Sequence, residues 1–301
     1  MSDLTLKHDL RSAASAGAEV RDYWLLLKPR VMSLVVFTGL VGLTLAPGHL
    51  HPLQAAIAVL CIALGSGASG AINMWYERDI DAVMQRTRSR PLPAGRMMPG
   101  EALGFGIVLA VASVLLMGLA LNWVAAALLA AAIGFYVFVY TIGLKRRTPQ
   151  NIVIGGAAGA FPPVIGWAAV TGDVGVPALV LFALIFFWTP PHFWSLSLYR
   201  ADDYAKAGVP MLPVVAGARA TRIQIFVYTL ILWPVSLAPT LIGMVGWVYG
   251  AAAIVLNLGF TALAARLVLE RDEYAARQMF RFSLGYLFLL FVFLVVDRIA
   301  A

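Results

Sequence analysis

The chain has 301 residues, of which 61% are hydrophobic and only 12% are charged. A soluble domain carries roughly 25% charged residues, so this composition excludes a soluble protein and indicates one embedded in a membrane. The apolar stretches are long and unbroken, which excludes the alternating pattern of a membrane β-barrel. Helices are then the way to satisfy every backbone polar group inside a bilayer.

Apolar runs of about 20 residues, the length that crosses a hydrocarbon core, follow one another along the sequence. They predict an all-α polytopic membrane protein in which nine spans form a single domain, residues 25–301, after an N-terminal tail, residues 1–24. The spans are expected at residues 31–48, 53–76, 101–121, 123–143, 150–170, 176–198, 221–243, 246–266 and 280–298.

Lysine and arginine residues gather in every second connection between the spans. Of the 22 such residues, all but Arg298 lie in the first 30 residues or in the segments 77–100, 145–147, 199–222 and 266–281. By the positive-inside rule these segments face the cytoplasm. This puts the N-terminus inside and, after an odd number of spans, the C-terminus outside.

The tail mixes acidic with basic residues and has no apolar stretch, so it has the pattern neither of a signal peptide nor of a mitochondrial presequence. A bacterial inner (plasma) membrane is therefore the expected location. The net charge of +7 suits contact with anionic lipid, and without a soluble domain it does not indicate nucleic acid as a partner. Cys61 lies in an apolar run and is expected to pack in the interior, while the glycine-rich stretches 65–70 and 155–159 predict close approach between helices.

Acidic residues cluster where the second span meets a basic loop. Asn73, Glu77 and Asp81 are spaced by four and so share one helical face. Oxygen ligands of this kind suit Mg²⁺, which is commonly held by one or two carboxylates together with substrate phosphates. Asp79 points to another face, where it is expected to pair with an arginine. A solvated helix end is the alternative, but three polar groups at the end of a span favour a functional site.

The loop that follows is basic. Arginine binds phosphate oxygens with a fork of N–H groups, and Arg86 and Arg90 are the candidates in residues 86–93. An acidic face beside such a loop outlines a diphosphate site. Anchoring to lipid headgroups is the alternative interpretation of any one of these arginines.

A second acidic group ends the sixth span. If that helix runs on after Pro190 and Pro191, then His192, Tyr199 and Asp203 lie near one line on its surface. The two prolines predict a helix break before His192. The alternative for His192 is a hydrogen-bonded side chain in the protein core.

Three segments together resemble the UbiA superfamily of intramembrane prenyltransferases, and within it the branch that modifies haem. They are Asn73 through Pro93, then residues 145–156 with Phe161-Pro-Pro163, and residues 191–204 with Gly208-Val-Pro-Met-Leu-Pro213. The resemblance extends over about residues 24–297. It implies nine helices around a central cavity, with the acidic segments facing each other at the cytoplasmic end. The sequence departs from the superfamily's usual Asp-x-x-x-Asp motifs at Glu77 and Tyr199.

For function, the resemblance implies transfer of a farnesyl group from farnesyl diphosphate to a vinyl group of haem b, giving haem O and diphosphate. It implies a catalytic, Mg²⁺-binding set, a diphosphate-binding set and a haem-binding set of side chains. These are, in that order, Asn73, Glu77, Asp81 and Asp203; Arg86, Arg90, Lys145 and Arg146; and His192 with Tyr199. Haem b is here a substrate rather than a cofactor, and a haem A synthase or a terminal oxidase assembly is the expected protein partner.

Three other functions are open at this point. A related enzyme prenylating another aromatic or tetrapyrrole acceptor shares the same motifs. A transporter is expected to carry ionisable residues deep within several spans, and no inverted repeat is evident. A haem chaperone without enzymatic activity needs no carboxylate face for a metal.

Overall fold

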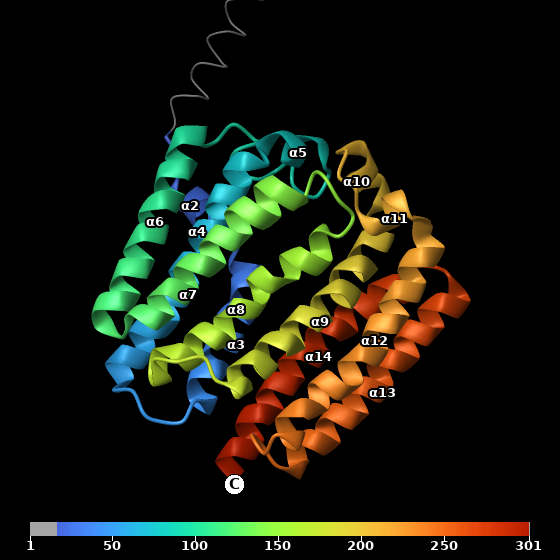
Figure 1. Cartoon of the computed structure of the whole chain (residues 1–301). Helices are drawn as coiled ribbons and strands as arrows, with labels where there is room; N and C mark the ends of the chain where they lie inside the picture. The colour runs from blue at the N-terminus through green and yellow to red at the C-terminus, as the bar shows by residue number, and fades with distance from the viewer. Residues whose placement is uncertain (1–16, 301) are drawn as a thin grey trace, which may run out of the picture.

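A computed structural model describes residues 17–300, and every regular element in them is helical (Figure 1). The elements are α2 (Val20–Leu26), α3 (Pro29–Leu45), α4 (Pro52–Tyr76), α5 (Arg78–Val83), α6 (Pro99–Ala120), α7 (Trp123–Gly134), the π-helix η1 (Phe135–Leu144), α8 (Asn151–Thr171), α9 (Val176–Leu198), α10 (Ala201–Lys206), α11 (Leu212–Val215), α12 (Gly217–Leu241), α13 (Trp247–Glu270) and α14 (Glu273–Ala300).

Within the described residues, eight helices are long and apolar enough to cross a membrane, with α7 and η1 together forming one of them. The pair α2 and α3, bent by 54°, makes a ninth when it is counted as one span. This agrees with the nine spans predicted. The first 16 residues of the predicted tail lie outside the described part, and α2 crosses the boundary placed at residue 24: Leu26 is buried, and Asp22 pairs with Arg96 at 2.9 Å.

Two predicted boundaries are wrong. The basic segment 266–281 is almost entirely helical, because α13 continues to Glu270 and α14 begins at Glu273. The ion pairs Arg266–Glu270 and Glu273–Arg277, at 2.7 and 2.9 Å, join side chains four residues apart and favour the helix beyond the apolar region. The other error concerns the prolines at 190 and 191: α9 passes through both without ending, as helices in membranes do when neighbouring groups satisfy the freed carbonyls.

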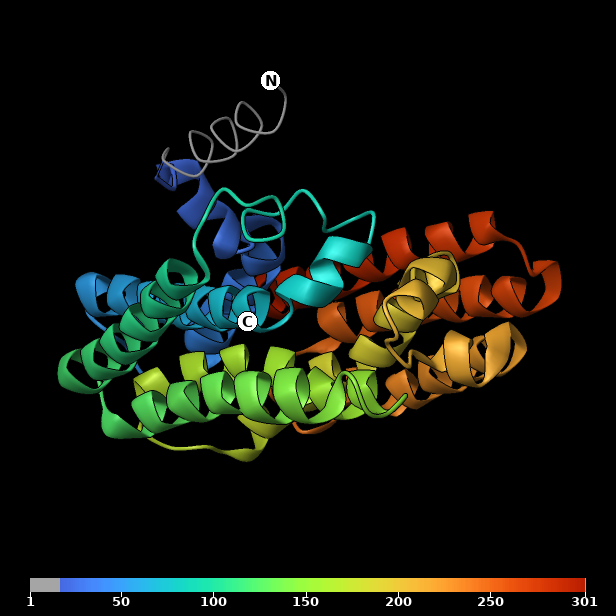
Figure 2. The same cartoon turned by 90° about the horizontal axis from the view of Figure 1, so that it is seen from above.

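The spanning helices pack so that segments far apart in sequence become neighbours (Figures 1 and 2). α4 packs against α6, α8 lies between α3 and α9, and α9 also contacts α12 and α14. The short helices α5, α10 and α11 all lie at one end of the bundle, which we call the site end. The described chain starts at the site end, and its C-terminus lies at the opposite end (Figure 1).

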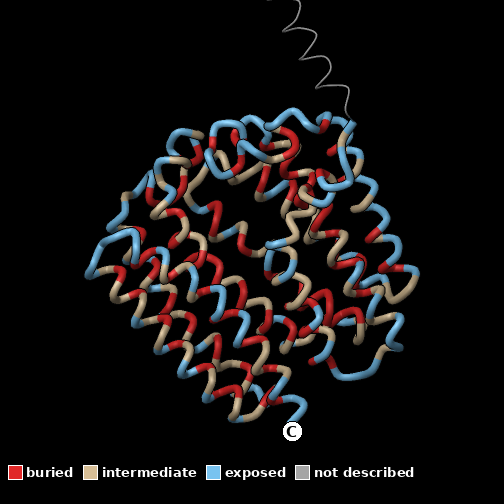
Figure 3. The backbone as a smooth tube through the Cα atoms, turned by 180° about the vertical axis from the view of Figure 1, so that it is seen from behind, coloured by how far each residue is buried: buried red, intermediate tan, exposed pale blue. Residues whose placement is uncertain are grey.

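Apolar residues on the outer surface show which faces meet lipid. On α6, Ile107, Val111, Leu115 and Leu119 are exposed, and their spacing of four places them on one stripe. Figure 3 shows exposed residues along the outside of the bundle and buried ones between helices. In water an apolar surface of this extent would drive association, whereas lipid chains cover it without cost.

Glycine allows two of these helices to touch at the backbone. A Cβ atom on Gly42 of α3 would overlap the carbonyl of Pro163 in α8, and one on Gly166 of α8 would overlap the carbonyl of Gly39. Both glycine-rich stretches of the sequence also pack closely: Gly65 would meet Leu129, and Gly155 would meet the ring of Tyr140. Small residues therefore set the distance between helices, as predicted.

Candidate active site

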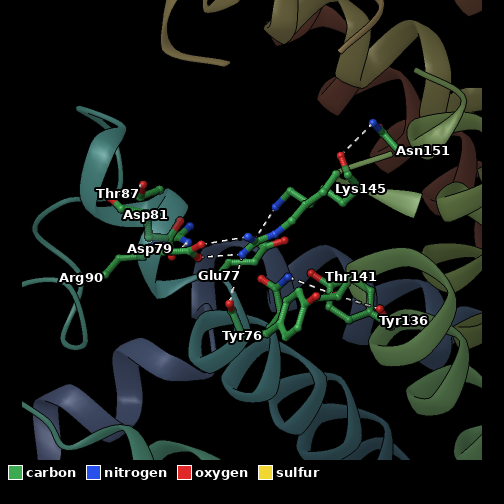
Figure 4. Close-up of polar contacts among 12 residues, drawn as sticks. Tyr76, Glu77, Asp79, Asp81, Thr87, Arg90, Tyr136, Thr141, Lys145 and Asn151 are labelled. Carbon is green, nitrogen blue, oxygen red and sulfur yellow. Dashed lines mark hydrogen bonds and ion pairs between the residues drawn. The ribbon is translucent and has the colours of Figure 1, made fainter. Parts of the chain in front are cut away.

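Glu77 and Asp81 lie buried at the site end (Figure 4), and Asn73, one turn before Glu77, is buried as well. α4 ends at Tyr76 and α5 begins at Arg78, so the helix bends at Glu77, where φ is −95° and ψ is 10°. The spacing of four survives this bend. The three residues are only 2%, 1% and 3% exposed respectively, which excludes a solvated helix end.

Each of the two carboxylates faces a cation from another segment. The ammonium of Lys145, the residue after η1, forms an ion pair with Glu77, and the guanidinium of Arg90 donates to Asp81 at 2.6 Å. Burial disfavours the charged form of Lys145, but the Glu77 carboxylate beside it raises the pKa of Lys145 above its usual value. Thr87 holds the loop around Arg90 by donating to the main-chain carbonyl of Asp81 at 2.9 Å.

The π-helix η1 brings a third element to this site. The N–H of Lys145 donates to the carbonyl of Tyr140, five residues back, and the hydroxyl of Thr141 donates to the carbonyl of Tyr136. Thr141 in turn accepts a hydrogen bond of 3.1 Å from the side-chain amide of Asn73. π-Helical turns are rare and often mark functional sites. Here the wider turn links η1 to α4 and directs Lys145 toward Glu77.

Lys28 belongs to this site although nothing in its sequence context indicated so. It lies at the bend between α2 and α3 in a left-handed conformation (φ 53°), and its ammonium donates to the side-chain oxygen of Asn73 at 2.6 Å. In the sequence it is one basic residue among several in the N-terminal segment. Only the packing of α2 against α4 distinguishes it from them.

Arg146 and Asp79 form a pair at the edge of the site. Arg146 donates to both carboxylate oxygens of Asp79, at 2.7 and 2.8 Å. The prediction that Asp79 leaves the shared face and pairs with an arginine is therefore confirmed, and this bond lowers the pKa of Asp79. Both residues border an open cleft of about 300 Å³, whose other wall is formed by residues 206–208 at the end of α10.

Asp203 lies on α10 and not on the helix that carries His192. α9 ends at Leu198, and Tyr199 and Arg200 leave the helical conformation before α10 begins. The predicted alignment of His192, Tyr199 and Asp203 on one line is thus wrong, because the chain turns between them. Asp203 is largely buried, its Oδ2 lies 4.0 Å from Arg200, and α5 and α10 both border the cleft described above.

The carboxylates do not form a complete metal cage by themselves. In residues 17–300 no three His, Cys, Asp or Glu side chains gather closely enough to hold a metal ion. Glu77 Oε1 and Asp203 Oδ2 are nevertheless buried without a hydrogen-bond partner in this part of the chain, and such atoms are costly unless something binds them. One or two carboxylates completed by substrate phosphates is the arrangement that Mg²⁺ uses, and carboxylate oxygens such as those of Glu77 and Asp81 are donors of the kind that this arrangement needs.

The remaining diphosphate candidate, Arg86, lies exposed on the loop after α5. Asn151, at the start of α8, was not predicted as a site residue. It is fully buried, donates to the carbonyl of Thr148 at 2.7 Å, and leaves its own side-chain oxygen without a partner in the described chain.

His192 lies on α9 and packs against α14. Its ring is stacked between Trp188 and Phe280, with ring centroids 4.3 and 4.8 Å away, and its Nδ1 lies 2.7 Å from the hydroxyl of Ser283. Tyr199 lies near the surface, where its ring contacts Phe280 and the guanidinium of Arg277. Phe280 thus contacts both His192 and Tyr199.

Spanning helices around buried, charge-paired carboxylates at one end of the bundle define a helical membrane enzyme. A model of the UbiA prenyltransferase family matches residues 35–292, and the chain belongs to this family. It is 59% identical to the protoheme IX farnesyltransferase of Granulibacter bethesdensis, over 99% of this chain and 96% of that protein. It is 60% identical to the protoheme IX farnesyltransferase of Gluconacetobacter diazotrophicus, over 95% and 94% of the two chains.

Solved structures agree on the fold. A digeranylgeranylglyceryl phosphate synthase matches with a TM-score of 0.78 at 18% identity, over 94% of this chain and 99% of that one. A UbiA homologue from Archaeoglobus fulgidus, bound to DMAPP and Mg²⁺, matches with a TM-score of 0.65 at 17% identity, over 88% and 99%. At this identity the likeness establishes the helical arrangement alone.

Proposed function

We propose that this prenyltransferase transfers the farnesyl group of farnesyl diphosphate to a vinyl group of haem b, forming haem O and diphosphate. The relatives named for this reaction match nearly the whole chain. The structural observation that carries the proposal is the pair of buried carboxylates, Glu77 and Asp81, each facing a cation from another segment.

A purely structural role explains this arrangement poorly. A buried ion pair adds little stability, since removing two charges from water costs about as much as their attraction returns. Ionisable groups buried within the transmembrane part of a protein are rare and usually serve function. Four charged residues from three segments, Glu77, Asp81, Arg90 and Lys145, therefore support a site for a charged ligand.

The diphosphate end of the substrate is the proposed ligand of this site. When bound, Mg²⁺ neutralises charge on the diphosphate as it leaves. Asn73, Glu77, Asp81 and Asp203 are the proposed ligands of the ion. Lys145, Arg146, Arg86 and Arg90 carry the positive charge that stabilises the negative charge on the leaving group, a contribution that is large where water is excluded.

The reaction then proceeds by electrophilic prenylation. The bond between the allylic carbon and the diphosphate oxygen breaks, and the electron pair leaves with the diphosphate. The vinyl group of haem b supplies the electrons of the new carbon–carbon bond. Water adds to the cation that remains beside the porphyrin ring and loses a proton, which completes a hydroxyethylfarnesyl side chain. Apolar helices around the site limit premature reaction of the farnesyl cation with water.

His192 and Tyr199 are the proposed contacts for haem. By the positive-inside rule the site end faces the cytoplasm, where a diphosphate substrate would enter. Lys145 and the arginines of the α5 loop all lie at that end, so the same residues favour both the orientation and the chemistry. A haem A synthase or a terminal oxidase assembly is the proposed recipient of the product.

The test is a purified assay with haem b, farnesyl diphosphate and Mg²⁺, in which haem O is detected by mass. We expect haem O to form, and a chelator to abolish it until Mg²⁺ is restored. A fully active protein at saturating chelator would remove the metal from the proposal. If no haem O forms but another prenylated tetrapyrrole does, the enzyme acts on an acceptor other than haem b.

A further inference from the structure

Ser283 of α14 contacts two residues of α9 that lie one helical turn apart. Its main-chain carbonyl accepts a hydrogen bond of 2.8 Å from the indole N–H of Trp188. Its side-chain hydroxyl lies 2.7 Å from Nδ1 of His192, one helical turn further on. Trp188 covers one face of the imidazole and Phe280 covers the other. The ring of His192 is therefore held in one orientation, and only its edge is free to bind anything.

The hydrogen bonds of Ser283 also decide which nitrogen of His192 carries the proton. A serine hydroxyl has a single hydrogen to donate, and that of Ser283 is directed to the carbonyl of Phe280 at 2.7 Å. Toward His192 the hydroxyl oxygen can then only accept, so Nδ1 must be the protonated nitrogen. The lone pair of the neutral ring consequently lies on Nε2.

Nε2 is available to a ligand. It forms no hydrogen bond within residues 17–300. It is also not fully buried, unlike the indole nitrogen of Trp194, which is buried and has no partner in this part of the chain. The residue keeps 7% of its surface exposed. A core histidine that served packing alone would be expected to satisfy both ring nitrogens.

We propose that Nε2 of His192 ligates the iron of the haem substrate, and that Ser283 is the positioning residue that fixes the required tautomer. Histidines that bind a metal usually donate their second N–H to an acceptor, which orients the ring and strengthens the bond. This inference rests on the proposed function for the identity of the acceptor. The iron bond fixes the porphyrin beside α9 while its vinyl group reacts elsewhere on the ring.

The experiment titrates ferric haem b into the purified full-length protein and records the Soret band and the electron paramagnetic resonance spectrum. The wild type should give the spectrum of histidine-ligated haem, and His192→Ala should lose it. Loss of a partner that orients a metal ligand costs roughly 10–100-fold in affinity, so Ser283→Ala should weaken haem binding by about that factor. Ser283→Thr keeps a hydroxyl and should restore it.

Two matched controls separate this role from general packing. Ser195 is also a buried serine beside His192, but it donates to the main-chain carbonyl of His192 at 2.7 Å, so Ser195→Ala should keep the wild-type spectrum. His49 is an exposed histidine of an outer loop, and His49→Ala should also leave it unchanged. If Ser283→Ala does not fold, imidazole is added to haem-loaded His192→Ala instead. Recovery of the histidine-ligated spectrum supports the bond between His192 and the iron, and an unchanged spectrum overturns it.

A histidine-ligated spectrum in His192→Ala, or wild-type affinity in Ser283→Ala, overturns the inference. Turnover distinguishes this result from failure of the proposed function. If the wild type makes haem O but His192→Ala keeps its spectrum, only the iron ligand is wrong. If His192 ligates haem and no haem O forms, the proposed reaction is wrong and the binding site stands.

Discussion

The ammonium of Lys145 and the carboxylate of Glu77 meet at the site end although 68 residues separate them in the chain. Lys145 follows a π-helix and Glu77 ends a transmembrane helix, so the pair joins η1 to α4. Glu77 is 1% exposed at its side chain and Lys145 is 18% exposed. Neither charge is well solvated, and each depends on the other.

This dependence predicts different effects of single and double substitutions on stability and activity. Glu77→Gln leaves the ammonium buried without its counter-charge, and breaking such a pair costs about 3–5 kcal/mol. Adding Lys145→Met removes the stranded charge and should recover most of that loss. Haem O formation should be abolished in both variants, because the proposed metal ligand is absent. Thermal unfolding and the haem O assay measure the two effects, and an active double variant would show that the pair is only structural.

Asp79 and Asp81 are two residues apart and differ in their surroundings. Asp81 is buried and faces Arg90, whereas Asp79 is 62% exposed at its side chain and bonded to Arg146. We expect Asp81→Asn to raise the Mg²⁺ concentration needed for activity by about tenfold or more, since of these two aspartates only Asp81 is a proposed ligand. Asp79→Asn should leave that concentration unchanged and alter stability by about 0.2–1 kcal/mol, as for surface ion pairs. Equal Mg²⁺ dependence in both variants would contradict this assignment.

Gly155 and Gly159 lie on α8, and only Gly155 packs closely against η1. A Cβ on Gly155 would overlap the ring of Tyr140, whereas one on Gly159, a turn later in the same helix, would have nothing within 4 Å. Gly155→Ala should destabilise the protein by about 1–3 kcal/mol, the usual effect of overpacking, and should reduce activity by displacing Tyr140. Gly159→Ala should unfold at the same or a higher temperature, because alanine favours a helix over glycine by about 1 kcal/mol. Similar behaviour of the two variants would mean that Tyr140 moves aside freely.

Much of the bundle could be predicted because apolar length decides where a helix crosses a bilayer. The expected span 176–198 coincides with α9, and the acidic residues spaced by four do share a buried side. The error was to continue α9 to Asp203: an apolar pattern marks where a span leaves the bilayer, but it does not show whether the helix continues beyond that point or turns, as it does at Tyr199. The π-helix was missed for a similar reason: η1 is as apolar as an ordinary span, and its register depends on contacts such as that of Thr141 with Asn73.

Lys28 was missed because its partner, Asn73, is 45 residues away in the sequence. Its ammonium donates to the side-chain oxygen of Asn73, and the side-chain N–H of Asn73 donates in turn to the hydroxyl of Thr141. Lys28→Met frees the side-chain oxygen of Asn73 and removes a positive charge beside the proposed diphosphate site, so kcat/KM for farnesyl diphosphate should fall by about tenfold or more, as expected when charge stabilising a leaving group is lost. Lys28→Arg keeps the charge and should retain more of the activity.

Arg30 supplies the matched control for Lys28. It lies two residues away in the same basic segment but is exposed, so Arg30→Met removes an equal charge without touching Asn73. If the charge of this segment served only to anchor the protein to anionic lipid, both methionine variants would lose activity equally in vesicles and recover together in neutral detergent. A defect in Lys28→Met that persists in detergent, with Arg30→Met fully active there, would show that Lys28 acts through the site.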